Sequence, residues 1–390
     1  MRSTYMAVSY KMSEHRDIIS LFTDLGEKIR IQWAKHNYNE DALVETAIDK
    51  LDEARLHQSL SADNLIHYAL NPDPLQSAHQ IDPPFGDLQQ IMYRHARFYI
   101  EALYWCDGTT AVHDHGFSGA FYVMTGSSIN LEYQFQDAER INHHFWLGKL
   151  SKPLVSKLQV GSIKPIYSGK RFIHSVFHLD NPTVSIVVRT YQDDDAMPQF
   201  EYRGKNIRLV EEFSPEFAKK IKGLRFLLSL NQEKFSYHFK HMYLESPLDE
   251  RYWLLRAFYA NFKQFPSIQQ FLKEMDDVQT NILMKSITQE AIIHKTMQFR
   301  NNIEDVELRY FLAVLLNLPS WSDVVQFIQN DYPNETNTVI ERALSNIKSH
   351  GLKIPEMTNH TLIHDYNNEE PITSNNVLYH LICRKVLANT

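Results

Sequence analysis

The sequence contains few cysteines and no long apolar run. Only two cysteines occur among its 390 residues, Cys106 and Cys383, and they have no CxxC spacing. This count excludes a disulfide scaffold and a zinc site built from cysteine thiolates. No run of eighteen apolar residues occurs, and the N-terminus lacks the apolar core of a signal peptide. We therefore expect a cytoplasmic protein without a membrane-spanning helix.

Dense clusters of Lys and Arg are also absent. The chain has 40 Lys and Arg residues against 47 Asp and Glu residues, which gives a formal net charge of −7. Binding to a phosphate backbone depends on clustered positive charge, so nucleic acid is not an expected partner. A hydrophobic fraction of 43% and a charged fraction of 22% are typical of globular proteins, and the length allows two or three domains.

The N-terminal part of the chain has apolar residues at helical spacing. Between Ser13 and Leu70 they recur every three or four positions, with Ser13 as the expected N-cap of the first helix. A second helix is expected to begin near Asn39. Prolines between residues 71 and 84 end the helical pattern, because proline lacks an N–H donor and fixes φ. We predict an N-terminal helical segment over residues 1–80.

The middle of the chain changes to the alternation that is typical of β-strands. From residue 97 to residue 191, short runs alternate between apolar and polar side chains, as around Leu131 and Tyr133. Turn signals such as Gly126-Ser127 separate these runs. The pattern predicts a β-sandwich or barrel, which we assign to residues 81–200.

After Pro198 the helical spacing returns, and we predict an α-helical domain over residues 201–390. Val306 and Ala313 are expected on one buried face of a helix that Pro319 ends. The polar stretch from residue 360 to 374 is expected to be a loop. Strands flanked by helices on both sides indicate an α+β fold.

Three histidines in the strand-rich region have the spacing of a metal site. His113 and His115 are two apart, so both rings point to the same side of a strand. His174 follows on a later apolar strand, after glycine turns at Gly161 and Gly169, and a barrel can bring that strand beside the first. Three imidazoles would form a facial nitrogen set with open positions. His178 is an alternative to His174 as the third ligand.

These two elements resemble the two sequence motifs of the cupin superfamily, and more narrowly those of the thiol dioxygenases, which include cysteine dioxygenase. The resemblance covers about residues 82 to 192. Most cupins add a glutamate four or five residues after the second histidine, but Gly119 and Ala120 stand there in this chain. The absence of that carboxylate is shared with the thiol dioxygenases. The resemblance implies a central double-stranded β-helix, the cupin barrel, flanked by the two helical regions.

The same resemblance implies a cofactor and a substrate class. It implies Fe(2+) bound by His113, His115 and His174, with another divalent metal as the alternative. It also implies that dioxygen transfers both its atoms to the sulfur of a small anionic thiol or amino-acid-like substrate.

Two further positions are carried over from that family. Tyr191 lies at the interval after His174 at which the family places a catalytic tyrosine. Arg94 resembles the arginine that grips the substrate carboxylate, a task that suits a forked cation, and Arg97 is the alternative.

The chain departs from the family next to that tyrosine. The family's Ser-x-His-x-Tyr run reads Val187-Val-Arg-Thr-Tyr191 here, so the serine and the histidine are missing. Arg189 takes the position of the histidine and is a catalytic candidate that would favour an anionic substrate. Two other functions therefore stay open. The first is a metal-dependent cupin enzyme of other chemistry, such as an isomerase or another oxygenase, and the second is a ligand-sensing cupin without catalysis.

Overall fold

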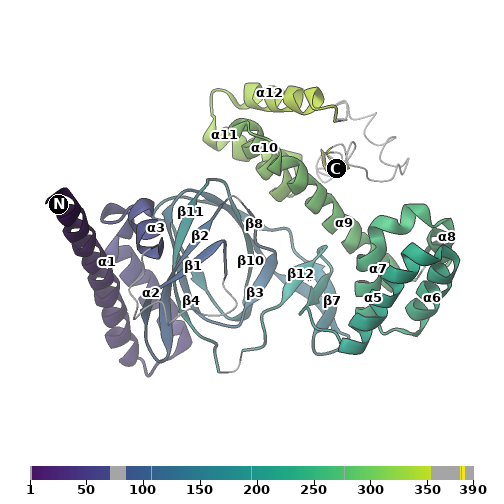
Figure 1. The fold of residues 1–390 in the computed structure, drawn as a ribbon, viewed down its shortest axis with the longest axis horizontal. Coiled ribbons are helices and arrows are strands. Elements are labelled where there is room, and N and C mark those ends of the chain that lie inside the picture. Colours follow the sequence, from purple (N-terminus) through teal and green to yellow (C-terminus); the bar gives the residue numbers. More distant parts are fainter. Residues whose placement is uncertain are drawn as a thin grey trace. The chain divides into compact units, whose positions relative to one another are not determined.

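The computed structural model describes residues 2–70, 85–106, 108–194, 196–275, 277–352, 378 and 380–382, with side chains from residue 17 onward (Figure 1). The proline-rich passage at 71–84 and the expected loop at 360–374 lie outside the described residues. The chain divides into two compact units. The first consists of Met1–Gln134 and Pro153–Gln199, and the second of Phe135–Lys152 and Phe200–Thr390. The three-domain organisation drawn from the sequence stays a prediction.

The first unit begins with helices. Their bounds are α1 Arg2–Ala34, α2 Glu40–Ala54, a short 3₁₀ helix Leu56–Gln58 and α3 Ala62–Leu70. The expected start of the second helix is confirmed, because the Asn39 side chain accepts a hydrogen bond from the Ala42 amide and so caps α2. The expected N-cap at Ser13 is wrong. Ser13 lies inside α1, since the helix begins eleven positions earlier than the apolar spacing indicated, at Arg2.

Two antiparallel sheets make up the rest of the first unit. One sheet has the strand order β1-β2-β11-β4-β9, and strands in the order β3-β10-β5-β8 face it from the other side of a shared core. Together with the helices they confirm the α+β fold class. The bounds are β1 Leu88–Arg94, β2 Phe98–Trp105, β3 Val112–His115, β4 Gly119–Thr125, β5 Ser128–Tyr133, β8 Leu154–Leu158, β9 Ile163–Ile166, β10 Gly169–His178 and β11 Thr183–Thr190.

Alternation along the strands gives the five-stranded sheet two apolar faces. On β2, Ile100 and Ala102 belong to a core that also contains α1 residues such as Phe22. On the same strand Leu103 points to the other side, where it packs with Phe172 of β10. Successive residues of β2 therefore pack alternately into the two cores, because side chains on a strand point to opposite faces in turn. The N-terminal helices cover one face of this sheet, and the second sheet covers the other.

The second unit combines four strands with eight α-helices among its described residues. The strands have the order β6-β7-β13-β12, with bounds β6 Phe135–Arg140, β7 Phe145–Leu150, β12 Glu201–Arg203 and β13 Ile207–Leu209. The helices are α5 Pro215–Leu230, α6 Gln232–Glu245, α7 Leu248–Phe258, α8 Pro266–Met275, α9 Val278–Asn301, α10 Val306–Asn317, α11 Trp321–Asp331 and α12 Thr336–Ser349. Strands β12 and β13 correct the expectation that residues after Pro198 are helical throughout.

The helix expected before Pro319 is confirmed as α10, which ends at Asn317. Its orientation differs from the expectation at one residue. Val306 is 80% exposed, because it occupies the first turn next to the capping residue Asp305, whereas Ala313 is buried as expected.

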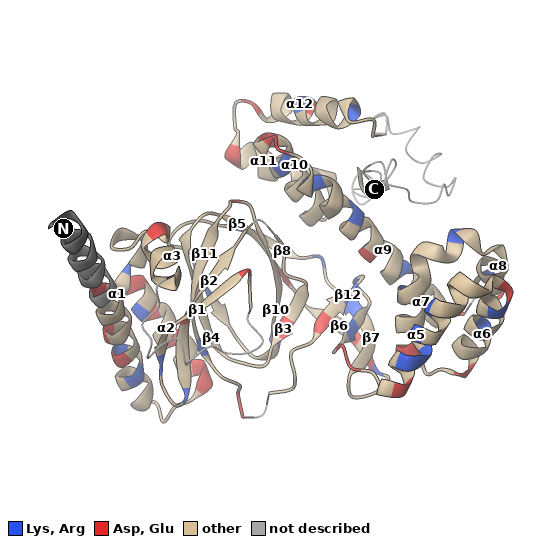
Figure 2. Ribbon diagram, in the orientation of Figure 1, with Lys and Arg blue, Asp and Glu red and all other residues tan. Residues whose placement is uncertain are grey.

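Charged residues of both signs are interspersed along the helices of each unit (Figure 2), for example in the pairs Lys28–Asp24 and Lys220–Glu216. Within the described residues, no helix combines the length and the apolarity needed to cross a membrane.

Candidate metal centre

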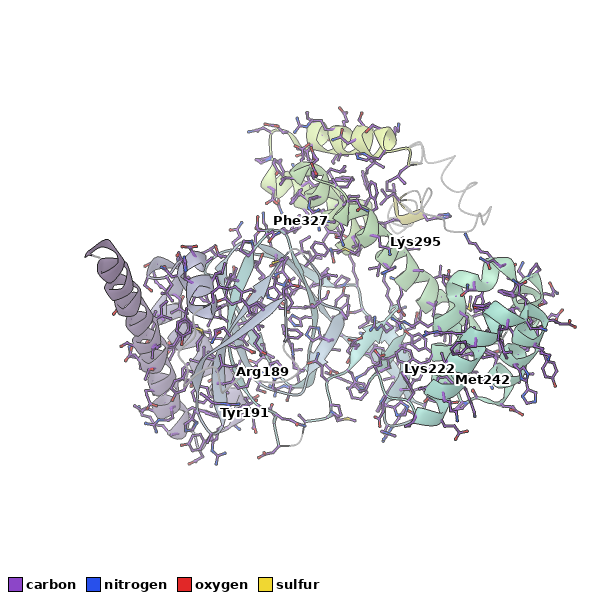
Figure 3. All side chains as sticks on the ribbon, viewed as in Figure 1. Arg189, Tyr191, Lys222, Met242, Lys295 and Phe327 are labelled. Carbon is purple, nitrogen blue, oxygen red and sulfur yellow. The ribbon has the colours of Figure 1, made fainter. Side chains whose placement is uncertain are left out.

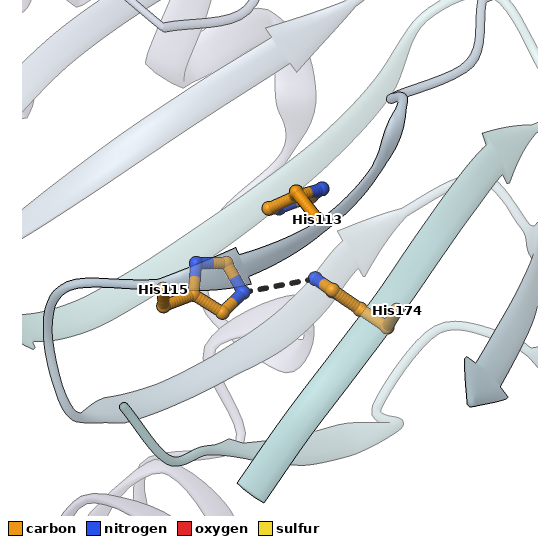
Figure 4. Close-up of side chains that lie close together, drawn as sticks. All are labelled: His113, His115 and His174. Atoms are coloured by element: carbon orange, nitrogen blue, oxygen red, sulfur yellow. Dashed lines mark hydrogen bonds between the residues drawn. The ribbon is translucent and has the colours of Figure 1, made fainter. Parts of the chain in front are cut away.

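The strand pairing of the first unit brings three histidines together. His113 and His115 lie on β3, and His174 lies on β10, directly opposite His113 in the antiparallel register. Because His113 and His115 are two residues apart, both rings lie on the same face of the sheet. His174, opposite His113 in the register, lies on that face as well. Figure 4 shows the three rings converging from the two strands. The three residues predicted as ligands from the sequence are therefore brought together.

The distances suit a shared ion. The coordinating atoms of His113, His115 and His174 all lie within 4.8 Å of one another. His115 Nε2 and His174 Nε2 are 3.0 Å apart. Two nitrogens bound at right angles to one metal at about 2.1 Å would be separated by about 3 Å, and a tetrahedral ion would place them slightly further apart. No repacking of the backbone is needed for these rings to bind one cation.

Hydrogen bonds fix the orientation of two of the rings. The Nδ1–H of His113 donates to the Ala111 carbonyl over 2.7 Å, so Nε2 is the unprotonated nitrogen when this ring is neutral. The Nδ1–H of His174 donates to Asn130 Oδ1 over 3.3 Å. Such partners on the far nitrogen are the usual support for histidine ligands.

The support of His174 continues through two more side chains. Asn130 Nδ2 donates to Glu132 Oε1 over 2.8 Å, which fixes the amide so that its oxygen faces His174. Lys164 Nζ donates to the same Glu132 oxygen over 2.6 Å and balances the carboxylate charge. The chain from Lys164 to His174 thus determines which nitrogen of the imidazole faces the cluster.

All three histidines are buried, and burial disfavours the charged form of an imidazole. Burial lowers the pKa of the His115 imidazole well below its usual range, and the neighbouring His113 and His174 lower it further. Burial, His113 and Lys164 act on the pKa of His174 in the same direction. Neutral imidazoles are the form that binds metals. The lone pair of His174 Nε2 points toward His115 Nε2. Two nitrogens this close need a proton or a metal cation between them, and a divalent metal could bind the third histidine as well.

His178, the alternative ligand, lies elsewhere on the cavity wall. Its ring stacks on Trp105, with centroids 4.6 Å apart, and its Nδ1 lies 3.0 Å from Ser128 Oγ. Burial lowers the pKa of His178 to about 3. The metal-ligating cluster found in the described residues contains His174 and does not contain His178.

The missing carboxylate has a structural reason. A Cβ built on Gly119 would lie 1.9 Å from the Val188 carbonyl oxygen, so β4 and β11 approach too closely there for any side chain. Ala120 points to the helix-covered core, away from the histidines. The next residue on the inner face is Phe121, whose ring centroid lies 6.0 Å from that of His174. These three positions supply no oxygen ligand.

The histidines open into a cavity of about 60 Å³. On this measure it holds roughly four or five water molecules, so it suits a small substrate. Its wall is largely apolar and aromatic, and includes Leu103, Trp105, Phe121, Val176 and Val187. Such a wall excludes water and strengthens the electrostatic interactions inside.

Two charged residues face this cavity, and sequence reasoning identified only one of them. Arg189 lies on β11 and packs its guanidinium over the Phe117 ring, 3.2 Å from the centroid. Glu101 on β2 is fully buried, its Oε1 lies 3.8 Å from Arg189 Nη1, and Gln89 donates a hydrogen bond to its other oxygen. Burial raises the pKa of Glu101, although Arg189 and Gln89 oppose that shift.

Glu101 had a signal in the sequence. Glu101 lies between Tyr99 and Leu103 in the row of alternate residues that share one strand face. A charged residue in such an apolar row is unusual. The pairing of Glu101 with Val187, two residues from Arg189, then places the two charges on the same side of the sheet.

The remaining predicted residues lie outside the cavity wall. Strand β11 ends at Thr190, and Tyr191 after it is 37% exposed (Figure 3), with its ring 5.0 Å from that of Tyr99. Its hydroxyl accepts from Arg94 Nε and donates to the His95 carbonyl, each over 3.0 Å. Arg97 packs over the Tyr38 ring, 4.5 Å from the centroid. Of the four residues predicted for catalysis or substrate binding, the structure brings only Arg189 to the histidines.

Comparisons with known proteins give distant similarities. No family model and no curated protein matches the chain. Among solved structures, it is similar to an RmlC-like cupin from Shewanella frigidimarina, with 14% identity over 27% of this chain and 78% of that one and a TM-score of 0.19. It is also similar to hydroquinone 1,2-dioxygenase from Sphingomonas sp. TTNP3, with 11% identity over 28% and 70% and a TM-score of 0.21. It is similar as well to KdgF from Halomonas sp., with 15% identity over 30% of this chain and 94% of that one and a TM-score of 0.21. Similarity at this level carries no argument about activity.

Proposed function

We propose that the two sheets of the first unit form a double-stranded β-helix of the cupin type that holds Fe(II) on His113, His115 and His174. The protein is then a dioxygenase of a small anionic molecule, with a thiol as the first candidate. The observation that carries this proposal is the convergence of three buried imidazoles, with no carboxylate in the cluster itself, at a small cavity that also contains Arg189.

The charge of the site favours an anionic substrate. Three neutral imidazoles add no negative charge, so a substrate that binds as an anion would balance a divalent cation. Ferrous iron, when bound, would supply the reaction with dioxygen. Arg189 reaches the same cavity and offers a forked donor set to a carboxylate or thiolate. Its packing against Phe117 holds the guanidinium in place before a substrate arrives.

The apolar wall has a separate task. Leu103, Phe121 and Val187 offer water no hydrogen bonds beside the histidines, so a bound substrate that displaces this water would be shielded from competing solvent. The small volume limits the substrate to a few heavy atoms. The roles of Tyr191, Arg94 and Arg97 that the family resemblance implies stay predictions, since these side chains lie outside the wall.

One observation favours a second candidate function. Glu101 faces the cavity, is fully buried, and is held by Gln89 and Arg189. A carboxyl so placed can take up and return a proton, which is what an isomerase requires of a general acid–base. The alternative is therefore a metal-dependent enzyme of this fold that moves a proton on its substrate without consuming oxygen.

Oxygen uptake separates the two candidates. We would load the full chain anaerobically with ferrous iron and follow dissolved oxygen on adding cysteine, 3-mercaptopropionate or cysteamine. Uptake that matches sulfinate formation with one of these thiols supports the dioxygenase. Stoichiometric iron without uptake from any of them contradicts it. Exchange of substrate hydrogen with D₂O under anaerobic conditions would then support the isomerase.

The matched variants are His113→Ala and His67→Ala. The first removes a ligand and is expected to lose bound iron, whereas the second removes a histidine whose side chain is 55% exposed on α3. Equal iron content in both variants would show that His113 is not a ligand and would remove the basis of the proposal.

A further inference from the structure

The second unit contains another cluster of metal-binding side chains, far in sequence from the first. His143 and His144 form the turn between β6 and β7, and Glu212 follows β13. Asp249 lies in the first turn of α7. Because β7 and β13 are paired, the turn and the segment after β13 meet at one end of this sheet (Figure 1).

The coordinating atoms of this cluster are close enough to share an ion. One nitrogen of each histidine and one oxygen of Glu212 lie within 4.8 Å of one another. His144 Nδ1 and His143 Nε2 are 3.2 Å apart, and His143 Nε2 lies 3.9 Å from Glu212 Oε2. Nitrogens on a tetrahedral zinc ion are separated by about 3.3 Å, so the two rings already have the required spacing.

Asp249 determines which nitrogen of His144 is available. Its Oδ2 accepts from the Nε2–H of His144 over 2.9 Å, so the Nδ1 lone pair faces His143. The Asp249 side chain is 10% exposed, and its Oδ1 has no hydrogen-bond partner among the described residues. A carboxylate on the far nitrogen of a histidine is the usual support of a metal ligand, and it raises the basicity of the ring.

The backbone of the turn is also fixed. The His144 amide donates to Asn142 Oδ1 over 3.1 Å, and its carbonyl accepts from the Val210 amide over 3.0 Å. The next residue, Phe145, is fully buried in the core of the unit. The position of His144 is therefore determined before any ion binds. A salt bridge alone would account for His144 with Asp249, but it would not bring the second imidazole, 3.2 Å from His144 Nδ1, and Glu212 to the other side of the ring.

We propose that His143, His144 and Glu212 form a second metal site, with Asp249 as its positioning residue, for a divalent transition-metal ion of the zinc type. Two imidazoles and a carboxylate suit such an ion better than Mg²⁺ or Ca²⁺, which prefer oxygen ligands. The His143 and Glu212 side chains are 66% and 63% exposed, so the ion exchanges with solution. When bound, it connects the β6–β7 turn to the segment after β13 and, through Asp249, to α7.

The test measures Zn²⁺ binding to the full chain. Metal-free protein is titrated with Zn²⁺ against a chromophoric chelator, in the wild type and in the His113→Ala variant, whose first site is disabled. The variant is expected to keep one equivalent of Zn²⁺. Adding His143→Ala or Glu212→Gln to it is expected to remove that equivalent. Asp249→Asn, which keeps the side-chain volume, is expected to weaken binding about 10- to 100-fold.

The control is His241→Ala, which removes another exposed histidine that is paired with a carboxylate, Glu245, on α6. It is expected to leave Zn²⁺ binding unchanged. If His113→Ala/His143→Ala binds as much Zn²⁺ as His113→Ala, the second site does not exist. The same conclusion follows if adding His241→Ala to His113→Ala removes as much bound Zn²⁺ as adding His143→Ala does. Because these comparisons are made without the first site, they do not depend on the function proposed for it.

Discussion

Replacing Arg189 by methionine would leave Glu101, the buried carboxylate of the cavity, without its cationic partner. Glu101 is fully buried, with Arg189 Nη1 at 3.8 Å and Gln89 as the other partner. Methionine keeps the unbranched stem of arginine but lacks the guanidinium that lies over Phe117. The part of the stability loss that comes from the unpaired Glu101 is therefore measured by comparing Arg189→Met with the double variant Arg189→Met/Glu101→Gln.

The size of the effect follows from burial and distance. Removing one partner of a fully buried ion pair costs about 3–5 kcal/mol, because the other charge is left uncompensated. The Arg189 side chain is 17% exposed, and 3.8 Å is longer than a direct charge-assisted hydrogen bond. We therefore expect a loss of about 2–3 kcal/mol. Adding Glu101→Gln should recover at least half of it, because the unpaired charge is then removed as well.

The loss must also depend on pH. Burial already raises the pKa of Glu101 in the folded protein, and without Arg189 the pKa rises further. A carboxyl whose folded pKa is raised stabilises the fold fully below the unfolded pKa of about 4.3, and this contribution is lost as pH rises through the folded pKa. Arg189→Met should therefore be closest to the wild type near pH 5 and furthest from it near pH 8.

Amide hydrogen exchange measures this locally. Protection of β2 and β11, which carry Glu101 and Arg189, would be compared at the two pH values after correction for intrinsic rates, with α7 of the other unit as reference. An equal loss at both pH values would refute the reasoning about Glu101. So would a double variant no more stable than Arg189→Met.

Three further changes test the metal centre and its surroundings. Asn130→Ala removes the acceptor that orients His174. The affinity for a divalent metal, measured by competition with a chelator, should therefore fall about 10- to 100-fold. An unchanged affinity would contradict the role of Asn130. His178→Phe should keep the stacking on Trp105 and the full metal content measured by elemental analysis; loss of the metal would make His178 a ligand. Gly119→Ala should cost about 3 kcal/mol or more in thermal unfolding, since its Cβ would overlap the Val188 carbonyl, and a melting temperature equal to the wild type would refute that contact.

The sequence predicted the site where spacing alone decides geometry. His113 and His115 had to share a strand face because side chains alternate, and the antiparallel register then placed His174 opposite His113. The α+β fold class followed in the same way from the change of period. The shared face of His113 and His115 needed no knowledge of how distant segments pack, whereas the approach of His174 depended on the pairing of β3 with β10 that the resemblance implied.

The sequence failed where position depends on what the chain does after a strand ends. Tyr191 lies one residue beyond β11, where its ring packs against Tyr99 and its hydroxyl bonds to Arg94 and the His95 carbonyl, so an interval measured along the chain did not place it at the histidines. Strands β12 and β13, each three residues long, are too short for a period to show. They form by pairing with each other and, for β13, with β7. Ser13 appeared to be a cap because a helix start leaves a weaker pattern than a helix face.

Glu101 and Arg189 explain why the cavity needs both an apolar wall and a charge pair. An isolated guanidinium in this wall would lose much of its hydration, and burial already lowers the pKa of Arg189. Glu101 compensates that charge in the free protein, but its 3.8 Å distance leaves the guanidinium donors incompletely used. An anionic ligand can therefore compete for Arg189, and when it does, Glu101 loses part of its compensation and takes up a proton more readily. Anion binding and protonation of Glu101 are then coupled, which predicts proton uptake on binding at a pH where the free protein keeps Glu101 ionised. An anionic ligand that binds without such uptake, measured in buffers of different ionisation enthalpy, would show that it does not engage Arg189.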